Sequence, residues 1–202
     1  WDYLLTKGGI STSAEVAAIC PPDHARHLER FICQLNERSE PTQSERDYLQ
    51  AFPGFAGGFA LPLMPARPGD ATWQPLAITV QGSPLQCAKR IAKGICLALD
   101  RIRAIKPGAI SLVYVPTAWA AYEIVNEAEE YFNLHDYVKA YAARNGQSTQ
   151  FVRERTVKGG SSCRVKWWVS LALYAKAMRT PWRLDCLEED SAFVGIGYIH
   201  DK

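Results

Sequence analysis

The feature that most restricts the fold is an alternation of apolar runs and helical patterns in the last part of the chain. Residues 110–115 read ISLVYV, a continuous apolar run typical of a strand that is buried on both faces. After it we expect, in order, a helix at 134–145, a strand at 149–152, a helix at 162–178 and a strand at 182–184. Strands joined by helices pair in parallel, so the sequence predicts an α/β fold, a Rossmann-like open parallel sheet with helices on both faces.

Earlier parts of the chain carry weaker patterns. Residues 1–16 contain Gly8-Gly9 and a Ser/Thr cluster, which favour a linker or lead-in segment. We then expect, in order, a strand at 15–20, a helix capped by Asp23 that runs to about residue 36, a short apolar segment at 60–64, a strand at 76–80 and a helix at 84–105. His24 and His27 have no third ligand at a useful spacing, so we interpret them as surface histidines.

The composition fits an ordinary globular protein, with 48% hydrophobic and 11% aromatic residues. No apolar run has membrane-spanning length and no signal peptide is visible, so we expect no membrane partner and a cytoplasmic location. The six cysteines lack metal-site spacing and are expected to be free thiols in a reducing compartment. The chain begins at Trp1 and ends inside an expected strand, so we expect it to be a piece of a longer protein.

Charge is distributed unevenly along the sequence. Residues 139–183 hold ten lysines and arginines against one acid, Glu154, a local net charge of +9, whereas the whole chain carries +2. The remainder is therefore about −7, and four glutamates without any basic residue lie directly before the block, at positions 123, 127, 129 and 130. A basic block inside a strand–helix pattern, rather than in a tail, predicts a folded anion site.

Four side chains in this region are the candidates for that site. His135 and Lys139 are four residues apart, so they share one face of the expected helix near its N-terminus, where Asn133 is a suitable cap. Gln150 lies on the expected strand that follows, and its amide both donates and accepts hydrogen bonds. Lys176 lies in the last turn of the 162–178 helix, which is apolar on nearly all sides and is therefore expected to be buried.

Each candidate also has an ordinary structural interpretation. Lys176 would complement the carboxyl end of its own helix, whereas His135 and Lys139 would form a solvated helix face. Gln150 would be a satisfied amide on an edge strand.

The order and spacing of these residues resemble a known family. The segments HDYVKAYAARNGQSTQF and CRVKWWVSLALYAKAMRTPW are similar to the MID domain of Argonaute proteins, and most similar to short prokaryotic Argonautes. The segment AFVGIGYIHD resembles the first strand of the PIWI domain, which has an RNase H-like fold. The resemblance implies a MID domain at 17–187 and the start of a PIWI domain at 188–202.

The resemblance implies a role for each candidate. Lys139, Gln150 and Lys176 match residues that contact the 5′-phosphate of a guide strand, and His135 stands where many relatives have a tyrosine that stacks on the first base. A further family lysine would fall on Ala172, so that contact is missing. Arg153, Arg155 and Arg179 are weaker candidates for contacts to backbone phosphates.

Glycine at position 197 is the main departure from the slicing members of the family. The family pattern has an aspartate there, and two-metal nuclease chemistry requires carboxylates. The resemblance therefore implies a chain that is not a nuclease, with any catalysis supplied by a separate effector protein.

The implied partners are a small guide nucleic acid, for which we favour RNA over DNA, and a complementary target strand from an invader. In some relatives a divalent cation such as Mg²⁺ bridges the guide phosphates through the glutamine and the carboxylate at the end of the chain. Two other functions stay open: a Rossmann-like enzyme domain acting on a nucleotide or phosphorylated metabolite, and a domain whose basic block docks an acidic protein.

Overall fold

The computed structural model describes residues 12–127, 129–159 and 162–177. The strands are β1 (Ala14–Cys20), β2 (Leu63–Pro65), β3 (Trp73–Pro75), β4 (Ile110–Val115), β5 (Ile124–Glu127), β6 (Glu130–Asn133) and β7 (Ser148–Arg153). The α-helices are α2 (Ala25–Gln34), α3 (Phe55–Phe59), α4 (Pro84–Ile105), α5 (Ala120–Glu123), α6 (Leu134–Arg144), α7 (Glu154–Lys158) and α8 (Cys163–Lys176). Three short 3-10 helices are η1 (Pro22–His24), η2 (Gln43–Glu45) and η3 (Thr117–Trp119).

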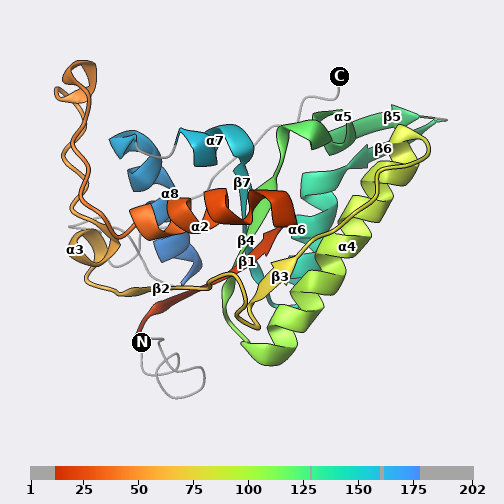
Figure 1. Ribbon diagram of the computed structural model, residues 1–202, viewed down its shortest axis with the longest axis horizontal. Helices are drawn as coiled ribbons and strands as arrows, with labels where there is room; N and C mark the ends of the chain where they lie inside the picture. The colour runs from red at the N-terminus through yellow and green to blue at the C-terminus, as the bar shows by residue number, and fades with distance from the viewer. Residues whose placement is uncertain (1–11, 128, 160–161, 178–202) are drawn as a thin grey trace, which may run out of the picture.

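Five parallel strands form the central sheet, in the order β2-β1-β4-β7 (Figure 1). One edge of β1 pairs first with β2 and then with β3, and its other edge pairs with β4. The pairing of β4 with β7 runs from Ile110 opposite Ser148 to Val115 opposite Arg153. Among the described strands β7 is therefore the edge strand on this side. The sheet and its helices confirm the predicted α/β class.

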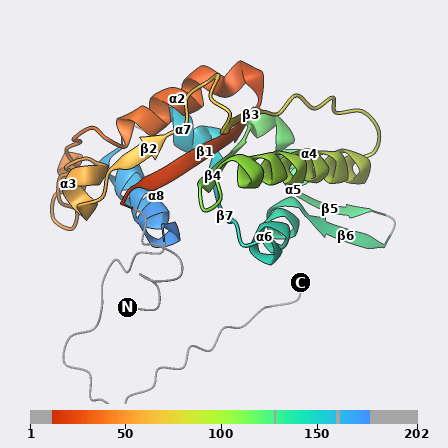
Figure 2. The same ribbon diagram turned by 90° about the horizontal axis from the view of Figure 1, so that it is seen from below.

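Helices cover both faces of the sheet (Figure 2). On one face, α2 and α8 pack over a core that includes Phe31, Leu112 and Leu173. On the other face, α4 and α6 pack over a second core that includes Leu99 and Val113. Alternate residues of β4 point into the two cores, so the whole strand is buried, as its continuous apolar run predicted.

Local signals explain where the helix α6 begins and ends. The side chain of Asn133 accepts a hydrogen bond from the backbone of Asp136, which caps the N-terminus. At the other end, the Gly146 and Gln147 amides donate to the carbonyls of Ala143 and Ala142, and Gly146 has a φ of +66°. This is a Schellman motif, in which a left-handed glycine ends the helix. Three residues then lead into β7, so the helix and the strand have a fixed register.

The structure differs from the sequence-based expectations in three places in the first half of the chain. Residues 76–80 are irregular rather than a strand, and pairing with β1 occurs earlier, at β3. Asp23 lies within η1, so it does not cap α2, whose N-cap residue is His24. Residues 14–16 belong to β1 and not to a lead-in segment.

Arg90 explains the irregular course of residues 76–80. Its guanidinium donates 2.9 Å hydrogen bonds to the carbonyls of Thr79 and Gln81, so α4 holds the segment through its backbone oxygens. These carbonyls are therefore occupied by an arginine side chain rather than by a neighbouring strand. Alternating apolar residues predict a strand only where a sheet edge is available.

Several elements were not anticipated from the sequence, among them β2, β3, α3 and α5. The acidic stretch before the basic block forms an antiparallel hairpin of β5 and β6, and α7 follows directly after β7. The expected strand at 182–184 and the expected PIWI start at 188–202 lie outside the described residues. None of the helices in the described part of the chain has both the length and the apolar character needed to cross a membrane.

Candidate functional site

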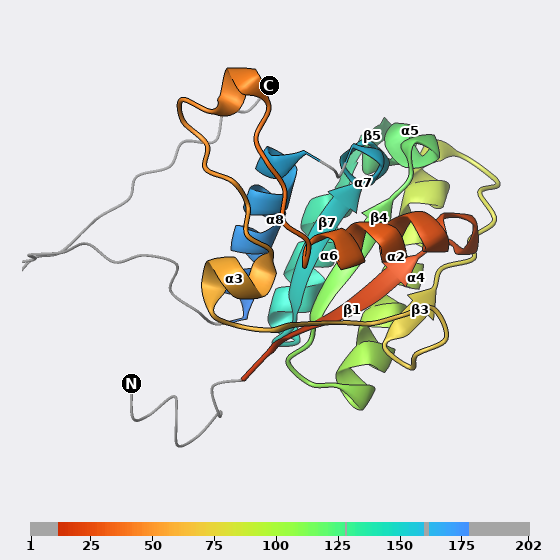
Figure 3. The same ribbon diagram turned by 60° about the vertical axis from the view of Figure 1, so that its left-hand side comes forward.

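The candidate side chains gather around the outer edge of β7. Figures 2 and 3 show this strand between α6 on one side and α8 on the other. Since the two helices cover opposite faces of the sheet, side chains from both can reach the same strand edge. The residues of the sequence motif thus come from three elements, α6, β7 and α8.

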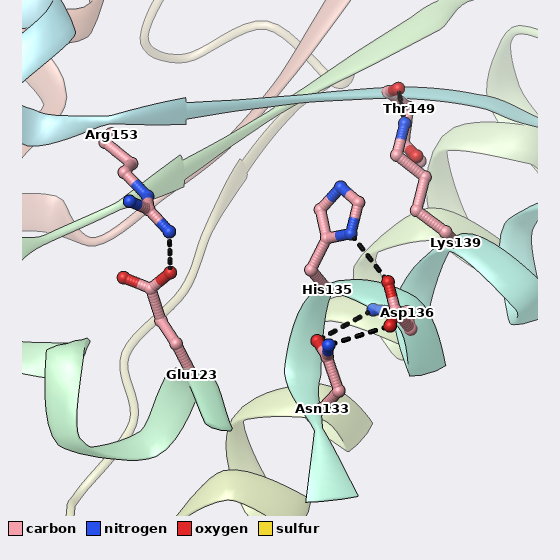
Figure 4. Close-up of polar contacts among 7 residues, drawn as sticks. All are labelled: Glu123, Asn133, His135, Asp136, Lys139, Thr149 and Arg153. Atoms are coloured by element: carbon pink, nitrogen blue, oxygen red, sulfur yellow. Dashed lines mark hydrogen bonds and ion pairs between the residues drawn. The ribbon is translucent and has the colours of Figure 1, made fainter. Parts of the chain in front are cut away.

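His135 lies in the first turn of α6, directed towards β7 (Figure 4). Its ring meets the ring of Phe151 edge-on, with centroids 4.9 Å apart, and its Nδ1 lies 3.0 Å from Oδ1 of Asp136. The side chain is 54% exposed. Phe151 and Asp136 therefore hold the ring in place while leaving more than half of it open to a ligand.

Lys139 lies one turn further along α6, and Figure 4 shows its side chain extending to the start of β7. Its ammonium group donates a hydrogen bond to the carbonyl of Thr149 and lies 5.9 Å from the ring centroid of Phe151. Burial, and then the positive charge of Lys176, lower the pKa of Lys139. The charged form of Lys139 is therefore disfavoured in the fold.

The other two candidates are Lys176 and Gln150, for which no contact with His135 is seen among the described residues. Lys176 is the last residue of α8, is partly buried, and has its pKa lowered by burial. Gln150 is partly buried, and its amide nitrogen donates a 3.0 Å hydrogen bond to the carbonyl of Phe151. The amide oxygen has no hydrogen-bond donor among the described residues, so the side chain can still accept one.

Three cations of the basic block are paired with acidic side chains. Arg153 pairs with Glu123, and Lys158 lies 2.6 Å from Glu154. Arg164 lies 3.6 Å from a carboxylate oxygen of Glu45. These pairs mean that the local charge of +9 is not presented as one continuous basic surface.

Four further cations of the block have no acidic partner among the described residues, and they differ in burial. Lys166 is 4% exposed, and its ammonium group lies 3.4 Å from the carbonyl of Glu37. Arg155 is exposed and forms no ion pair with a described residue. Lys139 and Lys176 likewise have no carboxylate partner within the described ranges. The charge of Lys176 acts on the pKa of Lys139, which relates these two cations of the predicted site.

A second polar cluster, which the sequence did not reveal, lies at the carboxyl end of the sheet. The Tyr114 hydroxyl lies 3.0 Å from Nδ1 of His24, and an oxygen of Glu154 lies 3.9 Å from the same nitrogen. Glu154 also accepts a hydrogen bond from the backbone of Thr117. Its pKa falls to about 2, mainly because of the hydrogen bonds from Lys158 and Thr117. His24, interpreted as a surface histidine, is therefore part of a defined hydrogen-bond network.

The acidic hairpin is tied to the rest of the chain through its carboxylates. Glu123 pairs with Arg153, Glu127 accepts the backbone N–H of Leu85 at 3.0 Å, and Glu130 lies 2.6 Å from Lys89. These contacts fasten the hairpin to α4 and β7. They account for most of the acidic stretch without a partner protein.

Among the described residues, few oxygen ligands for Mg²⁺ lie near the edge of β7. The cation prefers several oxygen ligands, including carboxylates, whereas this edge offers the amide oxygen of Gln150 and, beside His135, the carboxylate of Asp136. The described residues contain no group of three or more His, Cys, Asp or Glu that could hold a metal ion. We therefore assign no role to a metal here.

Arg179 and Gly197 lie outside the described residues, so the weaker phosphate contact and the missing aspartate stay predictions from the sequence. In comparisons with known proteins, no family model matches the chain and no curated protein matches it in sequence.

Proposed function

We propose that this chain is a guide-binding module of the MID type, which anchors the 5′-phosphate of a small guide nucleic acid. The supporting observation is the pair of lysines at the edge of β7. Lys139 comes from α6 and Lys176 from α8, and each has its pKa lowered by burial. Two partly buried ammonium groups with no carboxylate partner among the described residues destabilise the fold in the absence of a ligand. A terminal phosphate, with close to two negative charges, would offset that destabilisation.

The other two candidates suit the rest of a nucleotide end. The exposed face of the His135 ring provides a flat surface for the first base, and its position is fixed by Phe151. The Gln150 side chain keeps its carbonyl oxygen free to accept a hydrogen bond from a ligand. Cations and oriented polar groups from three elements would thus surround one terminal phosphate.

The wider proposal follows the resemblance of the sequence to short prokaryotic Argonautes. We infer that the protein is cytoplasmic. We also infer that it does not cut nucleic acid, because glycine occupies position 197. Its guide, for which we favour RNA, would pair with a target strand from an invader. A separate effector chain would then carry out the response.

The decisive experiment compares two oligonucleotides of the same sequence that differ only in the group at the 5′ end. A 5′-phosphorylated guide should bind the chain more tightly than the same guide with a 5′-hydroxyl. Lys139→Ala and Lys176→Ala should each reduce the affinity for the phosphorylated guide about tenfold or more, since a hydrogen bond between charged groups contributes about 1.5–3 kcal/mol. Affinity for the hydroxyl guide should change much less.

Lys93→Ala is the matched control, because Lys93 is exposed on α4 and makes no ion pair with a described residue. It should leave the preference for the phosphorylated end unchanged. Equal affinity of the unmodified chain for both guides would defeat the proposal. Saturable binding of mononucleotides with no dependence on strand length would instead favour an enzyme acting on nucleotides.

A further inference from the structure

A groove between α2 and α7 carries a second group of cationic side chains. It has a volume of about 340 Å³ and is lined by His27, Arg30, Phe31, Gln34, Val157 and Lys158. We call it the α2–α7 groove. The first four residues lie on one side of α2, and the last two come from α7, which follows β7 directly. The groove is thus separate from the edge of β7 but adjoins the end of the same strand.

The charged side chains that line the groove are cations, and one of them, Lys158, is paired with Glu154 outside the lining. Arg30 and Lys158 are permanent cations, His27 adds an imidazole and Gln34 an amide, and the lining contains no carboxylate. Arg30 is exposed and forms neither a hydrogen bond nor an ion pair with a described residue. Its planar guanidinium therefore keeps all of its donors for a ligand. Phe31 forms an apolar floor, being fully buried.

Glu154 holds Lys158 at the groove without lining the groove itself. One of its oxygens lies 2.6 Å from the Lys158 ammonium, and the other accepts the backbone N–H of Thr117 at 2.8 Å. Because the carboxylate is fixed on both sides, the lysine is positioned by a rigid neighbour. The ammonium group has three N–H donors, so two remain for a ligand.

We propose that the α2–α7 groove binds a phosphate group from the sugar–phosphate backbone of a nucleic acid strand. A guanidinium, an ammonium group and an amide around one cavity match the several acceptor oxygens of a phosphodiester. The volume also leaves room for an attached sugar. This inference rests on the proposed function, because it takes the strand to be the one whose 5′ end lies at the edge of β7.

The test measures salt dependence with a single-stranded oligonucleotide that carries a 5′-hydroxyl, which removes the terminal phosphate from the comparison. Arg30→Ala in the full chain should lower its affinity about threefold to tenfold at low salt, and Lys158→Ala should act in the same direction. Each loss of a phosphate contact should reduce the slope of log affinity against log salt by about 0.7. Arg101→Ala, an exposed arginine on α4, is the matched control and should change neither quantity.

The outcomes separate this inference from the proposed function. Unchanged affinity and slope in both Arg30→Ala and Lys158→Ala would overturn the groove assignment, even if the 5′-phosphate preference is intact. A reduced slope together with no 5′-phosphate preference would overturn the function of the β7 edge and leave the groove as a nucleic-acid site.

A free phosphate ion is the other source of the same chemistry. Inorganic phosphate should be titrated into a Lys139→Ala/Lys176→Ala variant, with Arg30→Ala added in a second sample. Phosphate binding that is lost with Arg30 and is as tight as oligonucleotide binding would show a free anion to be the ligand, contrary to our inference. Weak or absent binding of inorganic phosphate supports the backbone assignment.

Discussion

The hydroxyl of Tyr114 lies 3.0 Å from Nδ1 of His24 and links the centre of the sheet to the start of α2. Tyr114 is fully buried in β4, and its ring stacks on His24 with centroids 4.9 Å apart. Burial, together with the negative charge of Glu154, raises the pKa of Tyr114 above its ordinary range. The phenol therefore stays protonated at neutral pH.

Tyr114→Phe tests this link. Removing the hydroxyl takes away one buried hydrogen bond while preserving the ring, so the free energy of unfolding should fall by about 1 kcal/mol. Urea denaturation of both proteins gives the difference. Tyr48→Phe is the control, because Tyr48 is 65% exposed and its change should have no measurable effect. A Tyr114→Phe protein as stable as the unmodified chain would show that the bond contributes nothing.

Glu154→Gln should weaken the fold in a pH-dependent way. The pKa of Glu154 drops from 4.5 to about 2 in the folded chain, so the carboxylate contributes stability that is fully present above pH 4.5. That contribution disappears as the pH falls towards 2. At pH 7 the glutamine variant should be about 2 kcal/mol less stable, since it loses charged hydrogen bonds.

The difference between the two proteins should shrink steadily below pH 4.5, which urea titrations at several pH values would reveal. A difference that is the same at pH 3 and pH 7 would contradict the assigned pKa. Glu129→Gln is the control, because Glu129 is exposed and has no ion pair with a described residue.

Glu123→Ala should release Arg153 for a ligand. The Arg153 side chain is 53% exposed, and an exposed ion pair contributes at most about 1 kcal/mol, so the variant should fold normally. With its carboxylate partner removed, Arg153 becomes free to contact a phosphate. Affinity for a 5′-hydroxyl oligonucleotide should rise about twofold to threefold at low salt, as measured by fluorescence anisotropy. No rise would indicate that Arg153 lies away from the path of the strand.

The Lys139→Met variant should have a larger free energy of unfolding than the unmodified chain at neutral pH. The pKa of Lys139 is lowered in the fold, so its charged form is disfavoured there, and this penalty is fully present below the folded-state pKa. The penalty is relieved as the pH rises towards 10.5, the ordinary lysine value.

The advantage of the methionine variant should therefore become smaller between pH 7 and pH 10, as followed by chemical denaturation. An advantage that grows with pH would mean that the pKa of Lys139 is raised rather than lowered. Lys93→Met provides the comparison for general effects of removing a lysine.

The sequence predicted the second half of the fold more closely than the first. The elements at 110–115, 134–144, 148–153 and 163–176 follow the expected order, because continuous apolar runs and helix caps are local signals. Residues 76–80 have the same apolar character as a strand, yet the position beside the end of β1 is already occupied by β3. Which segment takes a sheet edge depends on contacts that are distant in sequence.

In the candidate site, too, local sequence patterns were predictive and contacts between distant residues were not. Helical spacing placed His135 and Lys139 together, and the α/β pattern placed Gln150 on a neighbouring strand. The neutralisation of Arg153 by Glu123, thirty residues away, had no local signal. Helix 162–178 was expected to be buried, but Trp168 is 65% exposed. Because α8 covers a sheet edge rather than its centre, one side of the helix remains open.

The short connection between α6 and β7 has a consequence for how this site can vary. Only residues 145–147 separate the helix from the strand, and Gly146 in this connection has a left-handed backbone conformation. Adding or deleting a single residue in the neighbouring helix would rotate His135 and Lys139 by about 100° around the axis. The short loop therefore fixes the position of the α6 side chains relative to β7. Substitutions change which ligand the edge of β7 can bind. Insertions or deletions in α6 would instead separate His135 and Lys139 from that edge.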